Sequence, residues 1–213
     1  MKVNEIFYSI QGEGVQVGFP TVFLRLFACD LRCTWCDSMY AVKGHDFRDM
    51  DFDDVVQAVA KFNSKRLCIT GGEPLIQKDD VEKITNHFLD KGYSIVLETS
   101  GHKKPPEIFS NENCIVSMDC KCPSSNMQDR MDFQLFEQLN SKDQLKFVVA
   151  DEQDFDYALG ILGKYKIKSS IIFQTVYSEN NSWLADAVLK TGLNNVRVIP
   201  QIHKVFWGEK RGV

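Results

Sequence analysis

Residues 21–36 read TVFLRLFACDLRCTWC, an apolar run that leads directly into three cysteines. The run predicts a buried β-strand, and Cys29, Cys33 and Cys36 follow it with the spacing C-x3-C-x2-C. Three thiolates so close in sequence can converge on one metal centre, although a closed structural site needs a fourth ligand. The stretch therefore predicts a metal site that keeps one coordination position open for chemistry.

The composition indicates one globular domain that spans residues 1–213. With 213 residues, of which 44% are hydrophobic and 25% charged, the chain can bury a substantial core. A net charge of −4 gives no indication of nucleic acid as a partner. No apolar run approaches the length of a membrane span, and residues 1–5 lack the apolar core of a signal peptide, so we expect a cytoplasmic protein without a membrane partner. In that compartment the seven cysteines are expected to be ligands or core thiols.

Short β-rich runs alternate with amphipathic segments along the chain. The predicted strands cover residues 22–27, 67–70, 94–98, 115–117, 145–149, 170–173 and 196–199. The predicted helices cover residues 52–62, 79–91, 133–139, 155–165 and 183–191. This alternation favours an α/β fold with a parallel sheet and right-handed crossovers. Because a full eight-stranded barrel usually needs about 250 residues, we predict a partial TIM-type barrel of about six β/α units, with a flat doubly wound sheet as the alternative.

Polar and glycine-rich segments gather directly after the predicted strands. Six strands are followed in this way, by the three cysteines, GGEP at 71–74, TSG at 99–101, DCKCP at 119–123, Gln174 with Thr175, and Pro200 with Gln201 and His203. The carboxyl ends of parallel strands meet at one edge of the sheet, where active sites of α/β proteins are built. The sequence therefore predicts an enzyme.

The cysteine spacing together with GGEP resembles the radical S-adenosylmethionine (SAM) superfamily. The resemblance implies that the three cysteines bind a 4Fe–4S cluster, whose fourth iron holds SAM for cleavage to a radical that removes hydrogen from the substrate. Thiolates are soft ligands that suit such clusters, and Gly71 and Gly72 would let the backbone approach SAM closely. The alternative is a zinc site completed by a distant cysteine, but a zinc site needs no GGEP loop.

The N-terminal part resembles a narrower group. EIFYSIQGEG at 5–14, Phe19-Pro20, and Asp37-Ser38 after the cysteines are similar to the 7-carboxy-7-deazaguanine synthase family of the radical SAM superfamily, and the resemblance extends to RGV at 211–213. It implies a carbon–nitrogen lyase that converts 6-carboxy-5,6,7,8-tetrahydropterin to 7-carboxy-7-deazaguanine with loss of ammonia, in the biosynthesis of queuosine and other 7-deazapurines. It also implies Mg²⁺ as a cofactor, a flavodoxin or ferredoxin-type electron donor, and a homodimer.

The same resemblance implies the residues of the ligand sites, with no catalytic side chain beyond the cofactor-derived radical. The SAM contacts would be Trp35, Asp37, Gly72, Ser117, Asp119, Lys121 and Gln174. The substrate contacts would be Ile10, Gln11, Gly12, Glu13, Arg25, Thr70 and Val213, in a short N-terminal segment, two strands and a C-terminal tail that closes the site. Ser38 would be the protein ligand of Mg²⁺.

Some of these residues have simpler explanations. Arg25 lies within an apolar strand, where it could form a structural ion pair instead of binding the substrate carboxylate. Glu13 could be only a turn residue, Ser38 a capping serine, and His203 a hydrogen-bonded histidine without a catalytic role. Cys68 is expected to be a core thiol, and no role is predicted for the remaining cysteines, Cys114, Cys120 and Cys122.

Two other functions share part of this pattern. An activase of the same superfamily, which makes a glycyl radical on a partner protein, would have the same three cysteines but no need of Gln11, Glu13 and Arg25. A zinc-stabilised binding module without catalysis would use the cysteines alone.

Overall fold

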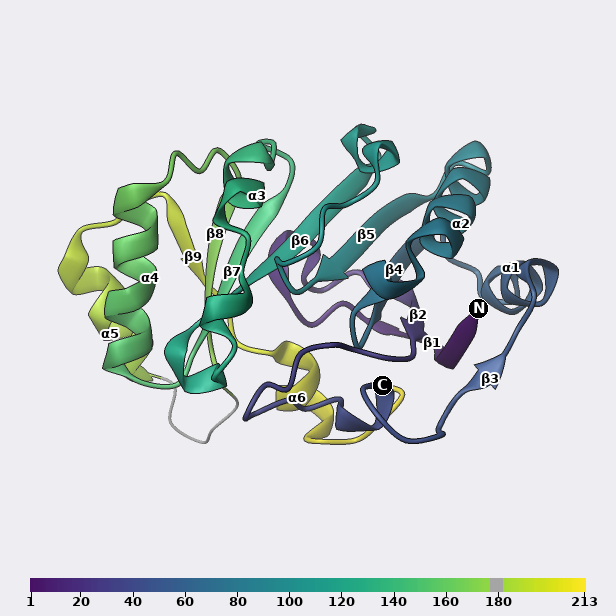
Figure 1. Cartoon of the computed structure of the whole chain (residues 1–213), viewed down its shortest axis with the longest axis horizontal. Coiled ribbons are helices and arrows are strands. Elements are labelled where there is room, and N and C mark those ends of the chain that lie inside the picture. The colour runs from purple at the N-terminus through teal and green to yellow at the C-terminus, as the bar shows by residue number, and fades with distance from the viewer. Residues whose placement is uncertain (177–181) are drawn as a thin grey trace.

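One nine-stranded sheet forms the centre of the molecule in the computed structural model, which describes residues 1–176 and 182–213 (Figure 1). The strands are β1 (Lys2–Ile10), β2 (Pro20–Leu26), β3 (Arg48–Asp49), β4 (Arg66–Gly71), β5 (Ser94–Thr99), β6 (Cys114–Lys121), β7 (Gln144–Val149), β8 (Ser170–Thr175) and β9 (Val196–Val198). Their order across the sheet is β3-β1-β2-β4-β5-β6-β7-β8-β9. From β2 onward every neighbouring pair is parallel, and β3 and β9 at the two edges do not pair, so the sheet is an incomplete barrel.

Each strand predicted from the sequence is present, and the seven parallel strands with their six crossovers agree with the prediction of about six β/α units. The short run at 196–199 contributes β9, which pairs with β8 from Ile171 opposite Val196 to Phe173 opposite Val198. The partial-barrel prediction agrees with the observed sheet.

The sequence analysis missed β1, because it treated residues 5–14 only as a segment that binds substrate. The strand pairs antiparallel with β2, placing Glu5 opposite Arg25 and Phe7 opposite Phe23. An antiparallel return needs no crossover helix, so β1 lies outside the alternation of strands and helices that reveals the other strands. Polar and apolar residues are mixed along β1, and its burial follows no simple alternation.

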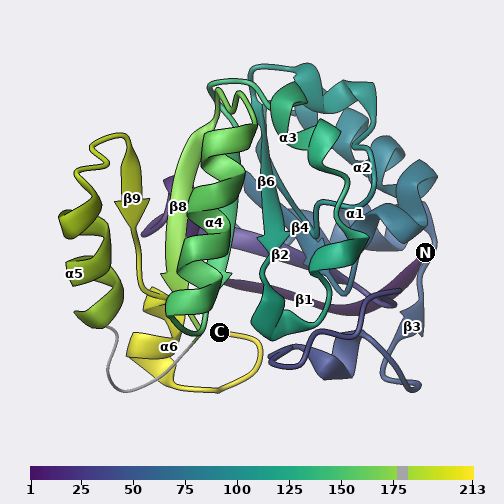
Figure 2. The same cartoon turned by 60° about the vertical axis from the view of Figure 1, so that its left-hand side comes forward.

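All helices except the last cover the outer face of the sheet, and Figure 2 shows α4 lying along β8. The helices are α1 (Phe52–Ala60), α2 (Lys78–Asp90), α3 (Phe133–Gln138), α4 (Glu152–Lys164), α5 (Ser182–Thr191) and α6 (Ile202–Trp207). Asp51, Asp132 and Asp151 cap α1, α3 and α4 by accepting a hydrogen bond from a backbone N–H of the first turn. Within the described residues, no helix has the length and apolar character that a membrane crossing requires.

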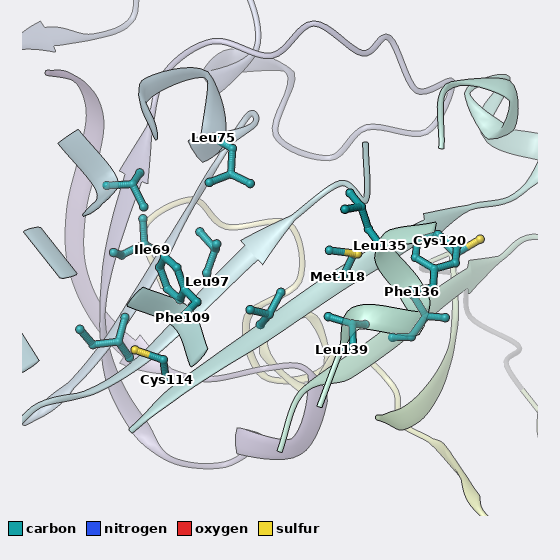
Figure 3. Packing of buried hydrophobic residues seen from close by; sticks show 14 of the residues in the cluster. Ile69, Leu75, Leu97, Phe109, Cys114, Met118, Cys120, Leu135, Phe136 and Leu139 are labelled. Carbon is teal, nitrogen blue, oxygen red and sulfur yellow. The ribbon is translucent and has the colours of Figure 1, made fainter. Parts of the chain in front are cut away.

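The strands divide their side chains between two hydrophobic clusters. Outward-facing residues such as Ile69, Leu97 and Met118 pack against the helices in the main core (Figure 3). Phe23, Cys68 and Val96 form a second, smaller cluster on the inner face. Because successive side chains of a strand point to opposite faces, the residue two positions after each member of this second cluster faces the same way. Those residues are Arg25, Thr70 and Glu98.

The inner face therefore begins apolar and becomes polar toward the carboxyl ends of the strands. Strand register places Arg25 beside Thr70, Glu98 beside Ser117, and Ser117 beside Gln144. Asp119 is beside Lys146 one step further along. This row of polar residues positions the candidate site.

Close backbone packing fixes the loop after β4 against the loop after β2. Gly71 has φ +147°, and a Cβ at this position would lie 2.1 Å from the carbonyl oxygen of Leu26. A Cβ on Gly72 would lie 2.3 Å from the carbonyl oxygen of Ala28. The N–H groups of Gly72 and Glu73 donate to these same carbonyls at 3.1 and 2.8 Å. Glycine at 71 and 72 is thus required by contact with the cysteine-bearing segment itself.

We predict that Gly71→Ala lowers the free energy of unfolding by at least about 2 kcal/mol, because the new Cβ meets backbone and the φ value is strained for alanine. Gly160→Ala is the matched control, since position 160 lies inside α4 with open space around it and alanine favours the helix by about 0.5–1 kcal/mol. Urea unfolding of both variants measures the difference. Equal stability of Gly71→Ala and the wild type would contradict this account of the loop.

Candidate active site

A cavity of about 630 Å³ opens at the carboxyl ends of the parallel strands. The loops after β1 and β2, the ends of β4 to β7 and residues 208–213 contribute to its wall. Figure 1 places α6 and the end marked C at this side of the sheet, beside the loop after β2. The cavity therefore lies where the sequence predicted that the polar segments would meet.

Cys29, Cys33 and Cys36 all line this cavity, and all three are free and partly exposed thiols. Two backbone hydrogen bonds hold this loop, one before the first cysteine, from Ala28 N–H to the Ala41 carbonyl at 2.8 Å, and one within the loop, from Thr34 N–H to the Ser125 carbonyl at 3.1 Å. Burial raises the pKa of Cys29 to about 11. Among the described residues, no three His, Cys, Asp or Glu side chains form a group that could hold a single metal ion.

The residues next to the cysteines have defined partners. Trp35 donates from Nε1 to the Ser124 hydroxyl at 3.0 Å, and the Asp37 carboxylate pairs with Lys204 of α6 at 2.8 Å. Ser38 begins the short 3₁₀ helix Met39–Ala41, but its side chain does not cap the helix. Its hydroxyl lies 3.9 Å from the Cys36 sulfur at the cavity wall. The capping explanation of Ser38 therefore does not describe this side chain.

Glu73 of the GGEP loop is a structural residue. Its fully buried carboxylate accepts hydrogen bonds from Leu75 N–H at 2.9 Å, the Thr99 hydroxyl at 2.9 Å and Ser100 N–H at 2.8 Å. These contacts join the loop after β4 to the end of β5. The neighbouring backbone requires glycine at 71 and 72, and this requirement is separate from the predicted approach of SAM.

Arg25 takes part in an ion pair and also faces the cavity. Its Nε donates to Glu5 Oε1 at 2.8 Å, and its guanidinium carbon lies 5.5 Å from the centroid of the Phe7 ring and 5.8 Å from that of the Tyr40 ring. The terminal nitrogens of Arg25 form no hydrogen bond within residues 1–176 and 182–213. The ion pair thus uses only Nε, and the two terminal nitrogens of the guanidinium remain available to a ligand.

Glu98 connects two residues that were predicted to bind substrate. One carboxylate oxygen accepts from the Thr70 hydroxyl at 2.8 Å, and the other accepts from Gln11 Nε2 at 3.3 Å. Ile10 and Gly12 line the cavity beside Gln11, and the ring of His203 packs directly against Gly12. The loop after β1 is therefore fixed from both the sheet and the C-terminal segment.

A buried chain of alternating charges crosses the cavity floor. Lys146 pairs with Glu13 and lies 3.2 Å from Asp119 Oδ1, while Lys121 lies 2.6 Å from Asp119 Oδ2. Gln201 donates to Glu13 Oε1 at 2.7 Å. Glu13 therefore forms a buried ion pair, and the explanation of Glu13 as only a turn residue does not account for this pair.

Residues 208–213 close one side of the cavity, and Arg211 attaches them to the sheet. It donates to Glu5 at 3.3 Å, Asp46 at 2.5 Å and Asn4 at 3.1 Å, and it lies 4.0 Å from the centre of the Tyr40 ring. Gly212 and Val213 line the cavity next to it. Glu5 is thus shared by Arg211 and Arg25.

Two of the predicted site residues are outside the cavity wall. The Ser117 hydroxyl accepts from Gln144 Nε2 at 2.6 Å, and both residues are buried. Gln174 is 1% exposed, and neither end of its amide has a hydrogen-bond partner among the described residues. The other predicted ligand residues line the cavity.

Several known proteins whose sequences are similar to this chain have the same function name. The family model for the radical SAM superfamily matches residues 25–131. A 7-carboxy-7-deazaguanine synthase from Thermoplasma acidophilum is 33% identical over 213 residues, covering 100% of both chains. A synthase of the same name from Methanospirillum hungatei is 35% identical over 204 residues, covering 96% of this chain and 84% of the relative. The chain belongs to the 7-carboxy-7-deazaguanine synthase family. The crystal structure of QueE from Escherichia coli shares the fold, with a TM-score of 0.76 at 21% identity, covering 94% of this chain and 93% of that one.

As a member of this radical SAM family, the chain uses a 4Fe–4S cluster and SAM. The residues at the site fit both groups. Three free thiols on one cavity wall are the ligand set of a cluster with one open iron. Asp119 at the cavity wall and the buried amide of Gln174, which has no hydrogen-bond partner among the described residues, are polar groups suited to a nucleoside.

The other four cysteines of this family member are buried in its two hydrophobic clusters. Cys68 is fully buried in the inner cluster, as predicted. Cys114, Cys120 and Cys122 are buried in the main core, and burial raises the pKa of each thiol. Cys120 points outward because it alternates with Asp119 and Lys121, which face the cavity.

The sequence analysis missed Glu5, Glu98 and Lys146. Each lies in a strand, and the argument that drew attention to Arg25, a charged residue within an apolar strand, applies equally to Glu98 and Lys146. Glu5 carried no such signal, because β1 itself was not recognised.

The carboxylates on the cavity floor make the stability of the fold depend on pH. Burial alone would raise the pKa of Asp119, but Lys121 and Lys146 lower it overall, and Lys146 does the same for Glu13. Their pKa values in the folded state thus lie below the ordinary range of about 4. The stabilisation is complete above that range and is lost as the pH falls through the folded pKa, because the unfolded chain binds more protons.

We predict that Asp119→Asn weakens the acid dependence of the free energy of unfolding. The wild type should lose stability more steeply than the variant below about pH 4, because the variant lacks one lowered pKa. Urea unfolding between pH 3 and pH 7 measures both slopes, with Asp156→Asn on the exposed side of α4 as the control substitution. Identical slopes for the wild type and Asp119→Asn would contradict the assignment.

Proposed function

We propose that this chain converts 6-carboxy-5,6,7,8-tetrahydropterin to 7-carboxy-7-deazaguanine with loss of ammonia. The observation that carries the proposal is the convergence of the cysteine loop, Arg25 and the loop after β1 on one cavity. The names of the relatives support it. When bound, the cluster and SAM supply one-electron cleavage of SAM and hence removal of a hydrogen atom from the substrate.

The chain's own residues bind and orient the pterin in this proposal. The two terminal nitrogens of Arg25 would bind the pterin carboxylate, since Glu5 already occupies Nε. Glu13, with Gln11 and Thr70, presents acceptors and donors for the amino-pyrimidine edge. Ile10, Gly12 and Val213 complete the wall, and closure by residues 208–213 excludes water.

The SAM site and the metal site would share the remaining walls. Five of the proposed SAM contacts line the cavity, namely Trp35, Asp37, Gly72, Asp119 and Lys121, and the other two, Ser117 and Gln174, are buried outside its wall. The Ser38 hydroxyl is a single hard ligand, so Mg²⁺ there would complete its oxygen shell with the substrate carboxylate and water.

The proposal extends to the protein as a whole. It treats residues 1–213 as one radical SAM domain whose N-terminal segment and C-terminal tail serve the substrate. It includes a flavodoxin or ferredoxin-type electron donor and a homodimer, both implied by the resemblance of the sequence to the family. It also includes a cytoplasmic location, which was expected from the sequence.

The test of this function is anaerobic reconstitution with iron and sulfide, followed by incubation with SAM, dithionite, Mg²⁺ and 6-carboxytetrahydropterin. We expect 7-carboxy-7-deazaguanine and ammonia, and no product from Cys36→Ala. Cleavage of SAM by an intact cluster without product would favour a different substrate or the activase function. Zinc without iron or sulfide after anaerobic purification would favour the binding module.

We predict that Ser38→Ala lowers the rate of product formation at saturating SAM by about tenfold and removes its response to added Mg²⁺. The slow cleavage of SAM in the absence of pterin should be unchanged, because the cluster ligands remain. Thr34→Ala is the matched control, since its hydroxyl is on the same loop but exposed and outside the cavity wall. A Mg²⁺ response in Ser38→Ala equal to that of the wild type would remove Ser38 from the metal site.

A further inference from the structure

Lys146 lies between two carboxylates that belong to different parts of the cavity. Its ammonium pairs with Glu13, on the loop after β1, and lies 3.2 Å from Asp119 Oδ1 on β6. Glu13 is in the proposed pterin site and Asp119 in the proposed SAM site. The Lys146 side chain is only 8% exposed, so this double ion pair is shielded from solvent.

The sheet fixes this position of Lys146. In the register of the parallel pair β6–β7, Lys146 is beside Asp119, while its chain neighbours Leu145 and Phe147 are fully buried in the main core. The lysine therefore extends along the inner face from a rigid central strand. Its four-carbon stem is flexible, so the position of the ammonium depends on the two carboxylates that it pairs with.

Each carboxylate is held at both oxygens, and Lys146 supplies one of the two contacts in each case. Glu13 Oε2 pairs with Lys146 while Oε1 accepts from Gln201 at 2.7 Å. Asp119 Oδ1 is beside Lys146 while Oδ2 pairs with Lys121 at 2.6 Å. The orientation of Glu13 and that of Asp119 therefore depend on one shared cation.

Lys146 is suited to a fixed charge and not to proton transfer. Burial would lower its pKa, but Asp119 and Glu13 raise it well above the ordinary value. A buried ammonium that keeps its proton must stay close to its counter-ions, because an unpaired charge in the interior is costly. A shift of either carboxylate therefore displaces Lys146 and, through it, the other carboxylate.

We propose that Lys146 is a positioning residue that couples the pterin and SAM sites through Glu13 and Asp119. A ligand that orders Glu13 also fixes Lys146 and with it Asp119, so each ligand prepares the site of the other. Coupling of this kind is reciprocal in the two binding constants. The inference rests on the proposed function, because it takes the pterin and SAM as the two ligands.

The experiment measures the dissociation constant of SAM with and without 6-carboxytetrahydropterin, and that of the pterin with and without SAM. Titration calorimetry of the reconstituted, unreduced enzyme avoids turnover. We expect each ligand to tighten the other by at least about fivefold in the wild type. In Lys146→Met this factor should fall to about one, with both ligands bound more weakly, while the iron content stays the same.

Lys142→Met is the matched control. Lys142 precedes the same strand and pairs with Asp143 at 3.0 Å, but it donates to the carbonyls of Phe109 and Cys114 and is outside the cavity wall. Its replacement should lower stability without changing the coupling factor. A merely structural role for Lys146 would make the two variants alike.

Three results would overturn the proposal: a coupling factor in Lys146→Met equal to that of the wild type, weakening of one ligand alone, or no coupling in a wild type that binds both ligands. If Lys146→Met does not fold, the double variant Lys146→Met/Glu13→Gln removes the pair of opposite charges together and should also show no coupling. A wild type that binds SAM but no pterin would instead refute the proposed function, and the coupling proposal with it.

Discussion

The close packing of the GGEP loop on the end of β2 is the constraint on which the site depends. Gly71 and Gly72 touch backbone atoms of Leu26 and Ala28, and no side chain larger than hydrogen fits between them. This contact sets where the cysteine loop leaves the sheet. Glu73, buried in the same loop, extends the attachment to the end of β5. The three cysteines are thus presented by a rigid corner of the barrel.

The alternation of side chains along the strands positions the other residues of the site. One face of each strand packs into the core beneath the helices, and the other face places a short apolar cluster below a polar row. Along this row Arg25, Asp119 and Lys146 form ion pairs, and Glu98 accepts hydrogen bonds from Thr70 and Gln11. Arg25, Asp119 and Lys146 are on central strands, so small motions of the surface loops leave the spacing of these three residues unchanged. The residues at 208–213 add a less buried wall, held by Arg211.

The fold was largely predictable because parallel strands and amphipathic helices leave strong local patterns. The seven parallel strands were found in this way, whereas β1 was missed because it pairs antiparallel and lacks a clear alternation. Of the site, the positions of the cysteines, Arg25 and the strand-end loops followed from spacing and topology. The ion pairs of Glu13 with Lys146 and of Glu5 with Arg211 join residues more than 100 positions apart. Neither these pairs nor that of Glu5 with Arg25 could be predicted from the local sequence. Gly71 and Gly72 show a further limit, since the sequence revealed that glycine was needed but not what approaches it.

An anaerobic crystal structure with the cluster, SAM and 6-carboxytetrahydropterin tests the central claim most directly. That claim is that one cavity on the inner face holds both ligands around the cysteine loop. The account predicts the pterin carboxylate on the terminal nitrogens of Arg25, with Lys146 still between Glu13 and Asp119. A pterin bound elsewhere, with the Arg25 terminal nitrogens engaged by protein groups alone, would contradict it.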